Sequence, residues 1–215
     1  MSYFRELPDL EYQSLSKERN SSLDYVRTKN IFRRVKLRDD LANATTVFDQ
    51  YQIEHGARPD TVAEELYGRS DLDWVVLISA GITNVKDQWP LSNYQLYNFA
   101  EQKYGNDLNN DKFYETIEVK DSLGRLILPA GKVVDKEFKI PDPNNYGQLL
   151  NPIRGVSNYE YETRKNNEKS SIYILKKLYL QQFLTDIRKI MIYTKSSQYV
   201  DSKLIRTENT RIKSP

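Results

Sequence analysis

The stretch YQIEHGARPDTVAEELYGRSDLDWVVLISAG, residues 51–81, decides the fold. Its first three residues favour a short strand, and residues 56–60 contain the Gly, Pro and Asp that are typical of a turn. Thr61 and Glu64 stand at the spacing of a capping box, whose side-chain oxygens accept hydrogen bonds from free amides at a helix start. The pattern predicts a strand, a turn and a helix that begins at Thr61.

Two short helices follow from the same stretch. Val62, Leu66 and Tyr67 share one helical face, and Gly68 supplies the left-handed residue that ends the first helix. Residues 70–80 predict a second helix, which is almost entirely apolar after its first turn and is therefore expected to be buried on most sides.

A third helix and several strands are expected next. Ser92 and Gln95 match another capping box, and the apolar spacing that follows predicts a helix ending before Gly105. Strand-like segments separated by turn residues then predict a small antiparallel meander. These segments are residues 113–119, 125–128 and 133–134.

The last third of the chain alternates between irregular and regular patterns. Residues 141–158, rich in Pro and Asn, indicate an irregular connection. Residues 159–163 and 171–175 favour a hairpin around Asn166 and Asn167, and residues 177–193 carry the apolar spacing of an amphipathic helix.

The composition excludes several classes of protein. Of the 215 residues, 39% are apolar and 29% charged, and the net charge of +2 calls for no nucleic-acid partner. The absence of cysteine and the single histidine exclude disulfides, thiolate chemistry and a His-rich metal cluster. No segment approaches the ~18 apolar residues of a membrane span, and the first residues do not match an export signal. We expect a globular protein of a reducing cytosol.

Catalytic and cofactor motifs are not convincing in this sequence. Residues 107–118 mimic the spacing of a calcium loop, but Lys112 occupies the position that requires glycine. Residues 155–159 lack the second glycine of a nucleophile elbow, and His55 has no evident partner. We therefore expect no enzyme activity, catalytic residue, metal, cofactor or small-molecule substrate.

Residues 51–68, with Trp74 and residues 82–84, resemble a LysM module. The resemblance implies an α+β fold with a small β-α-α-(β) unit. The opening turn is longer than in that family and no closing strand is evident after Asn84, and both departures argue against glycan binding. Three residues would border the two ligand loops and are candidate partner-binding residues: Tyr51, Arg58 and Asn84.

A wider pattern resembles a phage protein family over most of the chain. Residues 29–35, 71–78, 87–91 and 94–99 are similar to the small, LysM-containing baseplate wedge subunit of T-even-like contractile phages. The resemblance implies a structural virion protein of the tail baseplate that is assembled in the host cytoplasm. It also implies binding to neighbouring wedge subunits and to the central hub, without nucleic acid or membrane. The alternative is a peptidoglycan-binding LysM module of a cell-wall-targeting protein.

Four further residues are candidates for partner binding. Trp89 and Pro90 could present a large ring on a rigid backbone, although the pattern favours a role for Trp89 in capping the local core. Arg33 and Arg34 belong to a basic segment, residues 33–38, which two aspartates follow at once. That balance favours a subunit-facing segment over a phosphate-binding one.

The sequence predicts four regions. The first, residues 1–45, is an N-terminal docking arm, and residues 46–104 form the LysM-like domain with an added helix. Residues 105–194 form the C-terminal extension of meander, hairpin and amphipathic helix. Residues 195–215 are a polar tail that is expected to be ordered only when a partner holds it.

Overall fold

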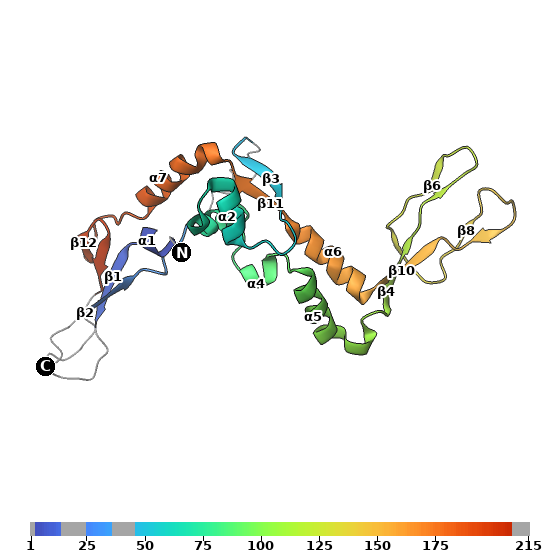
Figure 1. Ribbon diagram of the computed structural model, residues 1–215, viewed down its shortest axis with the longest axis horizontal. Coiled ribbons are helices and arrows are strands. Elements are labelled where there is room, and N and C mark those ends of the chain that lie inside the picture. The colour runs from blue at the N-terminus through green and yellow to red at the C-terminus, as the bar shows by residue number, and fades with distance from the viewer. Residues whose placement is uncertain (1–2, 14–24, 36–45, 208–215) are drawn as a thin grey trace. The chain divides into compact units, whose positions relative to one another are not determined.

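The computed structural model describes residues 3–13, 25–35 and 46–207, and it has the predicted mixed α+β character (Figure 1). Its described residues fall into two compact units. The first unit draws on Met1–Ile53, Ala57–Gln88 and Ile172–Pro215, and the second on Glu54–Gly56 and Trp89–Ser171. In sequence, nearly all of the second unit is therefore inserted into the first unit, between Gln88 and Ile172.

The helix pair of the first unit is α2 (Pro59–Tyr67) and α3 (Asp73–Ser79), joined by the 3-10 turn η1 (Ser70–Leu72). The predicted ends are confirmed, since Gly68 has φ of 71° and Ala80 caps α3. The predicted start at Thr61 is wrong, because α2 begins at Pro59. Proline suits the first helical turn, where its missing N–H has no partner to lose. Four side chains are fully buried between the helices: Val62, Ala63, Val75 and Val76.

The helix pair packs on elements from the far end of the chain. Strand β3 (Phe48–Gln52), which covers most of the predicted strand, pairs with β11 (Ser171–Leu175). Tyr67 at the end of α2 donates a buried hydrogen bond of 2.8 Å to the carbonyl of Leu175. Helix α7 (Leu180–Ile190), which follows η3 (Lys177–Tyr179), confirms the predicted amphipathic helix in shorter form. Its Phe183 ring stacks on Trp74 with centroids 6.3 Å apart.

Both ends of the chain meet in one four-stranded sheet, in the order β12-β13-β1-β2. It contains β1 (Asp9–Gln13), β2 (Tyr25–Lys29), β12 (Tyr199–Asp201) and β13 (Leu204–Arg206), and β13 runs parallel to β1. The short α1 (Tyr3–Glu6) precedes this sheet, and α4 (Val85–Gln88) ends the middle segment of the unit. The described part of the predicted tail is thus paired with the predicted arm of the same chain. Residues 1–2, 14–24, 36–45 and 208–215 of those regions lie outside the described residues.

The second unit pairs two helices. Helix α5 (Asn93–Tyr104) begins with the predicted capping box of Ser92 and Gln95 and is followed by η2 (Gly105–Asp107). Helix α6 (Asn158–Ser170) packs against α5. The predicted hairpin at residues 159–175 is wrong, because α6 occupies most of it. Ser157 caps this helix by accepting a hydrogen bond from the Glu160 amide at 3.1 Å.

The strands of the second unit are more branched than the predicted meander. In the three-stranded sheet, β4 (Asp111–Thr116) lies between β10 (Ile153–Ser157) and β7 (Val133–Val134). Two hairpins extend from it, β5 (Val119–Lys120) with β6 (Leu126–Leu128), and β8 (Ile140–Pro141) with β9 (Leu149–Leu150). The predicted irregular connection over residues 141–158 therefore contains strands, and β10 is one of the two strands that pair with β4.

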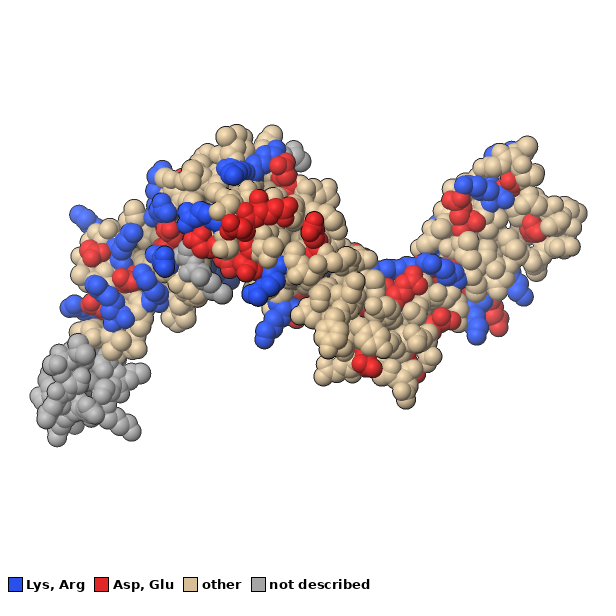
Figure 2. All heavy atoms as spheres, in the orientation of Figure 1, with Lys and Arg blue, Asp and Glu red and all other residues tan. Residues whose placement is uncertain are grey.

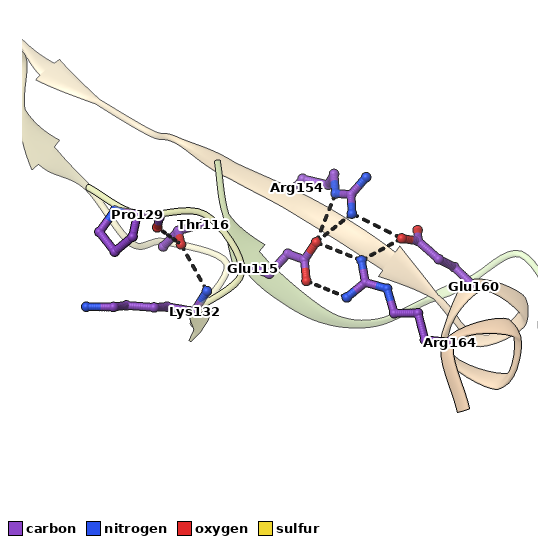
Figure 3. A network of polar contacts seen from close by, with 7 residues as sticks. All are labelled: Glu115, Thr116, Pro129, Lys132, Arg154, Glu160 and Arg164. Carbon is purple, nitrogen blue, oxygen red and sulfur yellow. Dashed lines mark hydrogen bonds and ion pairs between the residues drawn. The ribbon is translucent and has the colours of Figure 1, made fainter. Parts of the chain in front are cut away.

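An ion-pair network fastens this sheet to α6 (Figure 3). The buried carboxylate of Glu115 in β4 accepts hydrogen bonds from Arg154 in β10 and from Arg164 in α6, at 2.6–3.0 Å. Glu160 joins the same two guanidinium groups, at 3.1 Å from Arg154 and 2.6 Å from Arg164. The network stabilises the ionised carboxylate and holds the pKa of Glu115 at about 2.

Candidate partner-binding surface

Arg33 fixes an exposed turn of the first unit to the end of α7. Its Nη2 atom donates to the carbonyl oxygens of Ile190 at 2.6 Å and of Ile192 at 3.2 Å. Its guanidinium carbon also lies 5.1 Å from the centre of the Tyr193 ring. Helix C-terminal carbonyls have no partner within the helix, so a cation is favourable there. The predicted candidate Arg33 thus has a local structural role, because it holds the turn next to the C-terminal end of α7.

Asn30 gives the same turn two further ties. Its Nδ2 atom donates to the Tyr193 hydroxyl at 2.8 Å, and its Oδ1 atom accepts from the Phe32 amide at 3.2 Å. The Tyr193 hydroxyl in turn donates to the Asp9 carbonyl at 3.2 Å. The backbone that carries Phe32 is therefore held at several points.

Large apolar side chains are exposed on this turn and on the segment to which Arg33 ties it. Phe32 is 86% exposed and Ile31 is 65% exposed, beside the segment that carries Ile190 at 52% and Ile192 at 46%. We call these four side chains the Phe32 patch. A contiguous group of exposed apolar side chains on a folded protein marks an interaction site.

The segments that carry the Phe32 patch are basic. Residues 25–35 and 187–195 contain no Asp or Glu, and Figure 2 shows Lys and Arg side chains gathered over the part of the first unit that contains the four-stranded sheet. Arg34, the neighbouring predicted candidate, is exposed. Seven cations belong to the two segments: Arg27, Lys29, Arg33, Arg34, Arg188, Lys189 and Lys195.

Carboxylates on the adjoining elements partly balance these cations. Lys29 lies 2.8 Å from Asp9, and Arg188 lies 3.0 Å from Glu6. The hydrogen bond from Arg188 lowers the pKa of Glu6, because it favours the ionised carboxylate. The surface is therefore basic without being a continuous track of unpaired cations.

The three candidates drawn from the LysM resemblance make local contacts. The Tyr51 hydroxyl donates to Glu65 at 2.7 Å, and Arg58 lies 3.3 Å from Asp60. Asn84 accepts from the Lys86 amide at 3.1 Å through its side chain. These contacts are those of ordinary turn and helix-start residues, and the role of the three in partner binding stays a prediction.

Trp89 and Pro90 belong to the second unit. Trp89 is 6% exposed, so its ring is buried, and Pro90 is partly buried. Burial favours the core role that the sequence left open for Trp89, and a role in partner binding stays a prediction.

The second unit exposes apolar residues that the sequence did not single out. Leu123, Leu126 and Ile127 are 75%, 54% and 50% exposed on the β5–β6 hairpin. On the β8–β9 hairpin, Tyr146 is fully exposed and Leu149 is 68% exposed. Strands of two or three residues are too short for an alternating pattern to reveal which side faces solvent. The clustering of Leu and Ile on either side of a turn was the only available signal.

Two features of the described residues bear on other kinds of site. None of the helices described is long and apolar enough to cross a membrane. Over the same residues, no three or more His, Cys, Asp or Glu side chains are grouped so that they could hold a metal ion.

Comparisons with known proteins identify the family. A family model described as base plate wedge protein 53 matches residues 3–190. The baseplate wedge protein gp53 of Enterobacteria phage T4 is 26% identical over 192 residues, which span 85% of this chain and 92% of that protein. Because the family model covers most of its length, the chain belongs to the base plate wedge protein 53 family and is a non-enzymatic structural component of a phage tail baseplate.

Proposed function

We propose that this protein connects parts of the baseplate by binding neighbouring wedge subunits through both of its compact units, and that it helps to join wedges around the central hub. The observation that carries the proposal is that each unit exposes large apolar side chains outside its own core. Exposed apolar surface is unfavourable in water, so the free energy falls when a partner covers that surface.

Each unit offers its own candidate contact. In the first unit, the Phe32 patch lies next to cations that can select a partner by charge. In the second unit, the β5–β6 and β8–β9 hairpins carry leucine, isoleucine and tyrosine side chains at high exposure. A protein with two such contacts can bridge two neighbours, which is what a connector requires.

We further propose that β3, α2, α3 and β11 form the LysM-like unit expected from the sequence. The closing strand that was not evident after Asn84 would then be β11, which pairs with β3. The residues of the second unit would be an insertion between the second helix and this strand. In this arrangement the LysM-like unit serves as the scaffold that the two chain ends and the insertion project from.

The test uses wedge complexes from cells infected with a phage that lacks a functional copy of this gene. Purified full-length chain is added, and its co-sedimentation with the complexes is measured, with peptidoglycan sacculi in parallel. Binding to the wedge complexes without binding to sacculi is the expected result. Retention on sacculi without binding to wedges would overturn the proposal and favour the glycan-binding alternative.

A further inference from the structure

We propose that the Phe32 patch binds a short acidic segment of a neighbouring wedge subunit, one that presents apolar side chains between its carboxylates. This inference rests on the proposed function and deepens it, because it assigns one surface and the chemistry of its partner. It concerns only described residues of the first unit.

The turn is built to keep Phe32 outside the core. The hydrogen bonds of Arg33 to the Ile190 and Ile192 carbonyls hold the turn from one side, and those of Asn30 hold it from the other. A backbone turn that is already held in place loses little conformational freedom on binding, so only the Phe32 side chain has to be ordered. Phe32 therefore has the properties of an anchor residue, with aliphatic neighbours that can exclude water around it.

The size of the patch points to a segment as the partner. A standard interface involves about 20–30 residues on each side. Four apolar side chains on one turn and one helix end are far fewer than that. They suit a helix or an extended stretch that inserts a few apolar side chains, as in other modes of peptide recognition.

The charges select an acidic partner. The two segments that carry the patch contain seven Lys and Arg residues and no Asp or Glu. Arg34, two residues after Phe32 in sequence, is exposed. Lys189, next to Ile190 in sequence, has a side chain that is 71% exposed and lies 3.8 Å from Asp186. Carboxylates that approach these cations would steer the partner and fix its register.

A nucleic acid fits the same surface less well. Glu6, Asp9 and Glu11 pair with Arg188, Lys29 and Arg27, so the cations left for a partner are few and do not form the continuous basic track that a nucleic-acid backbone follows. Three of the four side chains in the patch are isoleucines, which cannot stack on bases as aromatic rings do. A protein segment with both acidic and apolar groups satisfies both features of the surface.

The test compares two double variants in the wedge-binding assay. The first, F32S with R34E, removes the anchor and reverses the adjacent charge. The matched control, K177E with L178S, makes the same kind of change in η3 of the same unit, where Leu178 is 83% exposed. Circular dichroism and thermal melting check that both variants fold.

We expect the F32S/R34E variant to bind wedge complexes at least about tenfold more weakly than the unmodified chain, with the control within about twofold. Raising NaCl from about 0.05 to 0.3 M should weaken binding of the unmodified chain more than that of F32S/R34E. Unchanged binding by F32S/R34E overturns the inference and leaves the proposed function standing. Failure of the unmodified chain to bind overturns both.

Photocrosslinking identifies the chemistry of the partner. A benzophenone amino acid replaces Phe32 in one sample and Leu178 in the other, and crosslinked peptides from the wedge complexes are sequenced. We expect Phe32 to yield one wedge-subunit peptide with several Asp or Glu residues among apolar ones, and Leu178 not to yield it. A crosslink to a second copy of this chain, to nucleic acid or to a basic peptide contradicts the inference.

Discussion

Arg164 in α6 and Glu115 in β4 meet in two hydrogen bonds, with Nη1 2.7 Å from Oε2 and Nη2 2.8 Å from Oε1. This bidentate pair joins a helix to a sheet strand 49 residues away in sequence. Glu115 is 5% exposed, so its charge depends on these partners in place of water. Arg154 adds a hydrogen bond of 2.6 Å from the neighbouring strand.

Replacing Glu115 with Gln should lower the free energy of unfolding by about 2 kcal/mol, because it removes the buried carboxylate and leaves the two guanidinium groups with the partly exposed Glu160 alone. The partly exposed arginines can be rehydrated, which keeps the loss moderate. Thermal melting of the full-length chain measures the effect. The control is Glu118→Gln, whose exposed partner is Lys120 and whose effect should stay below about 0.5 kcal/mol. Equal effects of the two changes would show that the network does not stabilise the unit.

Acid should weaken the fold through the same carboxylate. The pKa of Glu115 is held at about 2, below its ordinary value of 4.5, chiefly by the hydrogen bonds from Arg164 and then Arg154. A lowered pKa in the folded state gives stability that is present above about pH 4.5 and is lost as the pH falls toward 2. Between pH 5 and 3 the unmodified chain should therefore lose more thermal stability than Glu115→Gln. Parallel losses would assign the acid sensitivity to other groups.

Asn166 should stabilise the second unit, although it lies in a polar stretch of sequence that gives no sign of a buried residue. Its side chain accepts from the Leu91 amide at 2.7 Å and donates to the Leu91 carbonyl at 2.9 Å, and the residue is 5% exposed. Replacement by Ala leaves both backbone groups unpaired and should cost about 2 kcal/mol. Asn167→Ala is the control, because Asn167 is exposed on the same helix and should lose nothing or gain slightly from the higher helix propensity of Ala. Chemical denaturation of both variants measures the free energy of unfolding. Equal values for Asn166→Ala and Asn167→Ala would show that the Asn166 side chain does not stabilise the fold.

Helix α6 also shows why part of the fold was not predictable. Its buried residues are Glu162, Asn166 and Ser170, spaced four apart on one face. Each makes a hydrogen bond, for example Glu162 with Lys103 at 2.8 Å. A buried face made of polar residues gives no apolar periodicity, so the sequence around Asn166 and Asn167 predicts a hairpin turn where the structure has a helix. Two helix termini were predictable: the end of α2 at Gly68 and the start of α5 at the capping box of Ser92. Helix caps depend on residues within one turn of each other, so the local sequence is enough to predict them.

The candidate surface was predictable only in part. Arg33 and Arg34 were singled out by their charge, and they do lie beside the Phe32 patch. The other half of the patch comes from Ile190 and Ile192, more than 150 residues away, through hydrogen bonds of Arg33 to backbone carbonyls. Every residue has a backbone carbonyl, so the sequence does not indicate which carbonyl a side chain will bind. The proximity of residues 31–33 to residues 190–192 can be seen only in the structure.

Tyr67 should stabilise the link between α2 and β11. Its hydroxyl donates to the Leu175 carbonyl at 2.8 Å, and burial raises its pKa to about 12. Tyr67→Phe removes the donor, leaves a carbonyl unsatisfied and should cost about 1 kcal/mol. Tyr173→Phe serves as the control, because that side chain on β11 is 57% exposed.

In the unmodified chain, the raised pKa of Tyr67 means that stability present below pH 10 is lost as the pH rises toward 12. Tyr67→Phe should lack this component of alkaline sensitivity.

The two chain ends should depend on each other for their order. Strand β1 lies between β13 and β2, and the Asp9 amide donates to the Lys203 carbonyl at 2.7 Å. Leu204 in β13 is 4% exposed, so β13 also brings a buried apolar side chain. A chain that stops after Lys195 loses β12 and β13, and strand β1 becomes a sheet edge paired only with β2. An isolated two-stranded pair is marginally stable in water, so trypsin should then cleave after Arg27 and Lys29 several-fold faster. A chain that stops after Thr207 keeps β12 and β13 and should cleave at the rate of the full-length protein. Equal cleavage rates for all three chains would mean that β1 and β2 hold together without the C-terminal strands.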